Sequence, residues 1–344
     1  MRPNFFHHLH PPTIPAEQSR WRYTLGAGGM AVFLALVLMV TGVLEMFYFI
    51  PAPTEAALSI QKLTYFVPFG GMVRNLHFWA AQLLLFASAI HLIRVIFTGA
   101  YLPPRRINYL LGLALFVLII LLDFTGYILR WDQGIQWVLV VGANLVKSIP
   151  WLGDHLHHAL VGGAQPNATT LIRFYAWHLF GLTLPAIILV FWHAFRVRRD
   201  GGIAAPSPSP SAREARISRF ELVRREAAAM LFAGAALLLL STFFPAPIAP
   251  AITAIAAPAG DHRVPWFFLW VQQMLQWGDP FLWGVAVPLL TLLTLTLIPF
   301  VFPPPTAQEQ GRWFPKSNRL AQITLTGIVC LILLFTLFAV VSQN

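Results

Sequence analysis

The chain has 344 residues, of which 57% are hydrophobic and only 10% are charged, and its mean hydropathy is +0.67. A soluble globular domain carries about 25% charged residues, so this composition excludes an ordinary soluble protein and indicates an integral membrane protein. The net charge of +10 requires no nucleic acid as a partner, because basic residues at helix ends are attracted to anionic lipid headgroups.

Seven apolar stretches are long enough to cross a membrane as helices. Lipid offers the backbone no hydrogen-bond partner, and the chain lacks the alternating ten-residue pattern of a membrane barrel, so each stretch is predicted to be helical. The expected fold is an all-α integral membrane protein with seven transmembrane helices. In chain order the stretches are 26–50, 76–98, 107–129, 170–195, 226–245, 281–302 and 320–341.

The basic residues predict the orientation of these helices. If the N-terminus is cytoplasmic, 17 of the 23 lysines and arginines fall on the cytoplasmic side and six on the other. Because cytoplasmic loops carry the excess of Lys and Arg, we expect a multi-pass protein of the bacterial cytoplasmic (inner) membrane with its N-terminus in the cytoplasm.

One segment divides the chain into two modules. Residues 200–212 are rich in Pro, Ser and Gly, a composition typical of a flexible linker. The sequence therefore predicts a four-helix module at 1–199, a linker at 200–224 and a three-helix module at 225–344.

Four histidines repeat a spacing on two of the predicted helices. His77 and His91 lie 14 residues apart on the second helix, and His178 and His193 lie 15 apart on the fourth. At about 100° per residue, both spacings return to within about 60° of one face and separate the rings by about 21–22 Å along the axis. Two axial imidazoles give haem iron a six-coordinate centre suited to electron transfer. The pattern predicts two haems clamped between these helices; the alternative is that the histidines pack or hydrogen-bond against neighbouring helices.

Four glycines repeat the same period. Gly28 and Gly42 lie 14 apart on the first helix, and Gly112 and Gly126 lie 14 apart on the third. A haem edge or a neighbouring backbone approaches a helix closely only where a side chain is absent, although glycines also serve ordinary helix packing. Because Cys330 is the only cysteine, an intrachain disulfide, a C-x-x-C-H haem attachment and a cysteine-ligated cluster within this chain are excluded.

Five stretches within residues 1–200 together resemble a known family. They are Arg74–His77, His91–Arg94, Thr125–Gln133, Asn144–Gly153 and Thr170–His178. In combination they are similar to cytochrome b of the quinol:cytochrome c oxidoreductases, the Rieske/cytochrome b complexes. The 15-residue spacing and the Trp-Asp-Gln sequence at 131–133 resemble the chloroplast-type cytochrome b. The last three helices resemble its partner subunit IV more loosely, here fused to it.

The resemblance implies which histidines share a haem. His77 and His178 would be the metal ligands of a low-potential b-type haem on the outer side, and His91 and His193 those of a high-potential b-type haem near the cytoplasm. Both haems would be non-covalent. The predicted orientation agrees, because the second and fourth helices both run inward.

Further cofactor contacts follow from the same resemblance. Arg74 and Arg94, each three residues from a ligand histidine, would lie near haem propionates, where a guanidinium forms charge-assisted hydrogen bonds; interfacial snorkelling is the alternative. Arg198 resembles the arginine near the cytoplasmic quinone site. Gly26 stands where chloroplast-type proteins carry the cysteine that tethers an extra haem, so no covalent haem is expected.

The outer quinol site departs from the family pattern. The family has Pro-Glu-Trp-Tyr there, with a glutamate thought to accept a quinol proton, whereas this chain has Val264–Phe267. Quinol oxidation needs a proton acceptor. Asp123 and Asp132 are predicted to be catalytic at this site together with Trp266, since acids near the outward ends of apolar helices are functional candidates. Glu45 is a further candidate, with an interfacial carboxylate as the alternative.

Two functions fit these residues. In the first, the chain passes electrons across the membrane between two quinone sites, with quinol as substrate. A Rieske iron–sulfur protein and a c-type cytochrome would be separate partner chains, and the complex would form a homodimer as its relatives do. In the second, a non-bifurcating di-haem anchor links the quinone pool to a different redox enzyme. The missing glutamate and Arg130, which replaces a family proline, favour the second; Trp266 and the three-helix module favour the first. A third class is a haem-free transporter with structural histidines, whose purified preparation would be colourless.

Overall fold

The computed structural model describes residues 11–205, 215–252, 264–306 and 308–342. Within these residues seven helices are long and apolar enough to cross a membrane, so the predicted all-α fold with seven spans is confirmed. The spans are α3 (Ala27–Met46), α5 (Gly70–Phe97), α6 (Arg106–Leu129), the continuous α9 (Ala168–Ala176), η2 (Trp177–Gly181) and α10 (Thr183–Arg199), then α11 (Arg219–Phe243), η4 (Leu282–Ala286) with α13 (Val287–Val301), and η5 (Lys316–Asn318) with α14 (Arg319–Ser342).

Shorter elements connect the spans. They are β1 (Thr13–Pro15), η1 (Ala16–Ser19), α2 (Trp21–Thr24), α4 (Ala56–Phe66), α7 (Gln133–Lys147), α8 (Gly153–Val161), β2 (Arg216–Ser218), η3 (Trp266–Phe268) and α12 (Leu269–Leu275). Strands β1 and β2 pair antiparallel with Ile14 opposite Ile217, so the segment before α3 is tied to the segment before α11.

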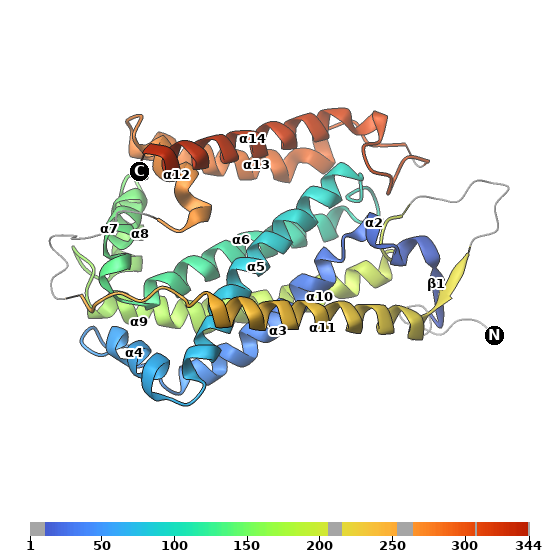
Figure 1. The fold of residues 1–344 in the computed structure, drawn as a ribbon. Helices are drawn as coiled ribbons and strands as arrows, with labels where there is room; N and C mark the ends of the chain where they lie inside the picture. The colour runs from blue at the N-terminus through green and yellow to red at the C-terminus, as the bar shows by residue number, and fades with distance from the viewer. Residues whose placement is uncertain (1–10, 206–214, 253–263, 307, 343–344) are drawn as a thin grey trace.

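The first four spans form a bundle around α5 and α6. Helix α5 packs against α3 on one side and α6 on the other, and α6 also packs against α9 and α10 (Figure 1). Leu34 of α3 and Ala80 and Leu84 of α5 belong to one buried cluster at the α3–α5 contact. Small residues at such contacts let two helix backbones approach closely, which is how helices associate in lipid.

The last three spans do not stay together. Helix α11 packs along α5 and α3, whereas α13 and α14 lie side by side on another flank of the bundle, with α14 against α12 and α5 (Figure 1). The fifth span thus joins the four-helix bundle in space although it follows the predicted linker in sequence. Residues 206–214 of that linker lie outside the described residues, and the two-module division stays a prediction.

Buried hydrogen bonds fasten α13 and α14 to the bundle. The Tyr109 hydroxyl donates to the Leu295 carbonyl at 2.6 Å, and the Asn318 amide donates to the Ile96 carbonyl at 2.7 Å. The Tyr101 hydroxyl donates to Asn318 Oδ1 at 2.6 Å. Burial raises the pKa of Tyr101 to about 12, because a buried phenolate would lose its hydration. The hydroxyl therefore remains a donor.

After α11 the chain crosses the end of the bundle that holds His77 and His178, which we call the His77 end; the opposite end is the His91 end. We call residues 244–252 the strap segment. Its backbone accepts hydrogen bonds from Trp79 at Phe244 and from Gln61 at Ala249, and its Ala246 N–H donates to Asn75. These bonds satisfy backbone groups of a segment that has no regular secondary structure beyond one bridge.

Candidate functional site

The four predicted histidines meet in two pairs inside the bundle. His77 of α5 faces His178 of η2 with 6.5 Å between the ring centres and an angle of 64° between the rings. His91 of α5 faces His193 of α10 with 6.3 Å between the centres and an angle of 79°. The structure therefore pairs the histidines as the resemblance implied.

The ring separations fit two imidazoles bound on opposite sides of one metal ion. Metal–nitrogen bonds of about 2.0–2.1 Å, with about 1.2 Å from each ring centre to Nε2, give about 6.5 Å between ring centres. Among the described residues no group of three or more His, Cys, Asp or Glu side chains could hold a bare metal ion. A metal between these pairs needs its remaining ligands from a planar macrocycle, as haem provides.

A π-bulge explains how spacings of 14 and 15 residues give matching pairs. In an unbroken α-helix, 14 residues end about 40° short of whole turns and 15 residues about 60° beyond. His178 lies within the π-helical turn η2, which takes up one extra residue between His178 and His193. The Thr183 hydroxyl donates to the His178 carbonyl at this bulge. The bulge brings His178 and His193 into register with the pair on α5.

Each of the four periodic glycines lies against the ring of one histidine. A Cβ atom added to any of them would come within 3.1 Å of the ring carbon Cε1. Two carbon atoms in contact normally lie about 3.5–4.0 Å apart. The close partner is thus the imidazole itself, where the sequence predicted a haem edge or a backbone. The pairs are Gly28 with His91, Gly42 with His77, Gly112 with His193 and Gly126 with His178.

Two threonines bind the histidines at the His77 end. Thr41 Oγ1 lies 2.9 Å from His77 Nδ1, and Thr125 Oγ1 lies 3.0 Å from His178 Nδ1. Each hydroxyl donates its own proton to a backbone carbonyl of its helix, so its oxygen accepts from Nδ1–H. That arrangement leaves Nε2 as the basic nitrogen, the one available to a metal.

The His91 end lacks this arrangement. The residues that precede Gly28 and Gly112 are Ala27 and Leu111, which carry no hydroxyl. The two histidine pairs therefore share their geometry but differ in the groups that polarise their rings. A hydrogen bond to a ligand imidazole raises its basicity, so this difference favours unequal redox properties at the two ends.

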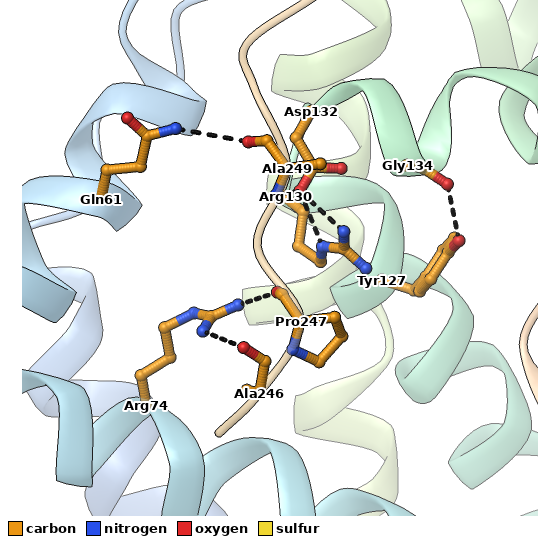
Figure 2. Close-up of polar contacts among 9 residues, drawn as sticks. All are labelled: Gln61, Arg74, Tyr127, Arg130, Asp132, Gly134, Ala246, Pro247 and Ala249. Carbon is orange, nitrogen blue, oxygen red and sulfur yellow. Dashed lines mark hydrogen bonds and ion pairs between the residues drawn. The ribbon is translucent and has the colours of Figure 1, made fainter. Parts of the chain in front are cut away.

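The two predicted propionate partners line the cavity between the helices. Arg74 is 8% exposed and donates to the carbonyls of Ala246 and Pro247 in the strap segment, at 3.0 and 2.5 Å (Figure 2). Arg94 is 4% exposed and donates to the Ala204 carbonyl at 2.6 Å. Arg74 therefore fixes the strap segment, a role the sequence did not predict. Contact of either arginine with a propionate stays a prediction.

One largely apolar cavity of about 2270 Å³ runs past both histidine pairs, and all four histidines and all four glycines line it. Asp123, Gln82 and Trp266 line it towards the His77 end. The Trp266 indole N–H donates to Gln82 Oε1 at 2.7 Å, and the Gln82 amide donates to Asp123 Oδ1 at 2.9 Å. Two of the predicted catalytic residues are thus linked through a glutamine that the sequence analysis did not identify.

The third predicted catalytic residue, Asp132, does not belong to the cavity lining. Its carboxylate pairs with Arg130 at 2.7 Å and accepts from the Ala249 N–H at 3.1 Å (Figure 2). The Arg130 guanidinium also lies 5.2 Å from the centre of the Tyr127 ring. Asp132 neutralises Arg130 and anchors the strap segment, so its geometry suits a structural role.

Arginines gather at the His91 end of the cavity. Arg198, predicted near a quinone site, lines the cavity there. Arg105 lines the same end, where burial lowers the pKa of its guanidinium and nearby Asp200 opposes that shift. Asp200 is itself buried in an ion pair with Arg196 at 3.0 Å. This basic end can attract anionic groups, and a quinone contact of Arg198 stays a prediction.

Comparison with known proteins agrees with this geometry. The profile of the family described as Cytochrome b(N-terminal)/b6/petB matches residues 82–254. Cytochrome b6 of Heliobacterium modesticaldum is 36% identical over 198 residues, which cover 57% of this chain and 90% of that protein. The chain belongs to the cytochrome b/b6 family. The family binds b-type haem, and its membership together with the seven apolar spans makes this chain a multi-pass membrane protein.

Two further relatives extend the comparison. The menaquinol:cytochrome c reductase cytochrome b subunit of Geobacillus thermodenitrificans is 33% identical over 175 residues, or 51% of this chain and 78% of that subunit. A chain of the solved structure titled "Hyperthermophilic respiratory Complex III" has the same fold, with a TM-score of 0.75 and 19% identity over 92% of this chain and 91% of that one. The fold likeness therefore extends beyond the matched family region.

Three residues of the site were missed by sequence reasoning. Thr41 and Thr125 each precede a periodic glycine, and this Thr-Gly pair, repeated on the first and third helices, was a signal in the sequence. Gln82 gave no such signal, because its partners Asp123 and Trp266 lie 41 and 184 residues away along the chain.

Proposed function

We propose that this cytochrome b binds two b-type haems, one between His77 and His178 and one between His91 and His193, and passes electrons across the membrane between two quinone sites. The observation that carries the proposal is the pair of equal gaps between histidine rings, 6.5 and 6.3 Å. The 14 residues between His77 and His91 on α5 separate the two gaps by about 21 Å. Two low-spin centres at that separation form a path for electrons through the apolar core.

The two ends of the path take different roles in this proposal. The low-potential haem lies at the His77 end, which faces outward, and the high-potential haem lies at the His91 end, which faces the cytoplasm. Two observations support the assignment. In the orientation predicted from the sequence, 17 of the 23 basic residues fall on the cytoplasmic side. Among the four ligands, the threonine hydrogen bonds occur only on the His77 and His178 rings. Strengthening a ligand's basicity stabilises the ferric state and lowers the potential.

The proposed activity needs partner chains. Cys330 is the only cysteine, so this chain cannot ligate an iron–sulfur cluster with cysteines or attach a c-type haem. We infer that a Rieske iron–sulfur protein and a c-type cytochrome are separate subunits of a quinol:cytochrome c oxidoreductase-type complex, and that two such complexes form a dimer. The relative from Geobacillus thermodenitrificans is named as a subunit of a menaquinol:cytochrome c reductase, which supports this assembly.

The runner-up function is a di-haem anchor that conducts electrons in single file to another redox enzyme. The residue before Trp266 is Pro265 and not an acid, which favours this alternative. The second departure, Arg130, favours it less, because Asp132 neutralises the charge of Arg130. A Rieske protein that co-purifies with the chain would decide for the complex, and a stable complex with a different redox enzyme would decide for the anchor.

A haem count tests the proposal. The complex purified from membranes should contain two b haems per chain by the pyridine haemochrome assay, and a redox titration should resolve two potentials. His193→Leu should remove the haem at the His91 end and leave the other, while His155→Leu, an exposed histidine outside the pairs, should leave both. A single haem in the unmutated chain, or two haems in His193→Leu, would refute the pairing.

A further inference from the structure

Three side chains from distant segments form a hydrogen-bonded line at the His77 end. Trp266 comes from η3, Gln82 from α5 and Asp123 from α6, and the bonds between them measure 2.7 and 2.9 Å. The Gln82 amide uses its oxygen towards Trp266 and its nitrogen towards Asp123. The loop that carries Trp266 is thereby linked to a carboxylate within the membrane-spanning bundle.

The second oxygen of that carboxylate has no partner in the described part of the chain. Asp123 Oδ2 is buried and makes no hydrogen bond to any described residue, while Asp123 lines the cavity beside Gly126 and Tyr127. A buried carboxylate oxygen without a donor costs free energy. A ligand hydroxyl that enters the cavity supplies the missing donor.

We propose that Asp123 is the group that accepts a proton from the hydroquinone oxidised at the His77 end, with Gln82 as the residue that positions it. This inference rests on the proposed function, because it assumes that a hydroquinone is the substrate there. It assigns to α6 the acid that is absent from the segment before Trp266.

In the proposed oxidation one hydroxyl O–H bond of the hydroquinone breaks and its proton bonds to Asp123 Oδ2. The haem that His77 and His178 would hold would accept one electron. A one-electron, high-potential partner centre would accept the second electron, and the second hydroxyl proton is released to water. The hydroquinone becomes the quinone, and Asp123 becomes a neutral acid.

Gln82 acts through Asp123 and not on the substrate. Its amide nitrogen holds Oδ1, so Oδ2 is the oxygen left without a partner among the described residues. Its amide oxygen holds Trp266, so the same side chain also fixes one wall of the cavity. Loss of Gln82 should therefore weaken both substrate binding and proton transfer.

Glu45 is the competing acid. It lines the same cavity and its Oε1 is also buried without a partner. Glu45 lies on the last turn of α3 and does not belong to the hydrogen-bonded line of Trp266, Gln82 and Asp123. The other titratable or charged groups that line this part of the cavity, apart from the ligand histidines, are Tyr127, Arg130 and Tyr175. Asp123 is the carboxylate joined to Trp266.

The test measures electron transfer from duroquinol to cytochrome c by the complex purified from membranes. Asp123→Asn should lower the turnover number about 100-fold or more, the usual effect of removing a general base. Asp123→Glu, which keeps a carboxyl group, should retain more activity than Asp123→Asn. Gln82→Leu should raise the KM for duroquinol as well as lower turnover. Asp154→Asn, an exposed acid whose side chain is 85% accessible, is the matched control and should not change the rate.

Two readouts separate this inference from the proposed function. Haem content and the reoxidation of dithionite-reduced haem by duroquinone should be unchanged in Asp123→Asn, because they report folding and the His91 end. Normal turnover of Asp123→Asn with both haems present, or loss of turnover in Glu45→Gln alone, overturns the role of Asp123 and leaves the proposed function standing. If the unmutated complex contains both haems but reduces no cytochrome c, the proposed function fails. In that case the rate at which duroquinol reduces the haem is compared between the unmutated complex and Asp123→Asn. This rate should still fall in the variant if Asp123 accepts the proton.

Discussion

Gly126→Ala should selectively weaken haem binding at the His77 end. An alanine Cβ there would lie 2.9 Å from His178 Cε1, whereas carbon atoms pack at about 3.5–4.0 Å, so the ring must move by at least about 0.6 Å. That shift exceeds the tolerance of about 0.2 Å on metal–ligand distances. Overpacking of this kind costs about 1–3 kcal/mol, or roughly 5- to 150-fold in haem affinity.

The assay is the number of haems per purified chain, with a redox titration to identify which haem is lost. Gly29→Ala is the control, because its Cβ would meet nothing within 4 Å. Alanine stabilises a helix relative to glycine by about 1 kcal/mol, so a loss in Gly126→Ala alone cannot come from helix propensity. Two haems with unaltered potentials in Gly126→Ala, or an equal loss in Gly29→Ala, would refute the contact between glycine and imidazole.

Two other changes test the polar contacts of the same end. Thr125→Val removes the acceptor of the His178 Nδ1–H. It should raise the reduction potential of the haem at the His77 end by about 20–65 mV, the equivalent of a net hydrogen bond of about 0.5–1.5 kcal/mol. The potential of the second haem in the same titration should stay unchanged. Arg130→Met leaves Asp132, whose side chain is 3% exposed, without its ion-pair partner. It should destabilise the fold by about 3–5 kcal/mol, measured as loss of helicity at a lower temperature. The double variant Arg130→Met with Asp132→Leu should recover much of that stability. A double variant as unstable as the single one would contradict the role of the ion pair.

The membrane-spanning helices could be predicted from the sequence because the requirement behind them is local. Each span must satisfy its own backbone hydrogen bonds in lipid, so a run of apolar residues is sufficient evidence, and all seven spans were predicted correctly. The histidine and glycine periods were readable for the same reason, since a helix converts spacing into a common face. The pairing of His77 with His178 and of His91 with His193 followed from the family resemblance.

The contacts between segments could not be predicted in this way. The spacing of 15 residues between His178 and His193 fits the 14 on α5 only because η2 is a π-bulge, and neither residue type nor hydropathy marks that bulge. Asp132 was a candidate beside Asp123 in the sequence. In the structure Asp132 pairs with Arg130 and the strap segment outside the cavity lining, whereas Asp123 lines the cavity and is joined to Trp266 through Gln82.

The sequence by itself determined a seven-span membrane protein with two pairs of imidazoles and the glycines that accommodate them, because periodicity and hydropathy act within single helices. Only the tertiary structure decided which ring each glycine faces, which hydroxyls polarise the rings, and which acid is joined to Trp266. Those contacts join residues far apart in the chain, and their geometry depends on how whole helices pack against one another.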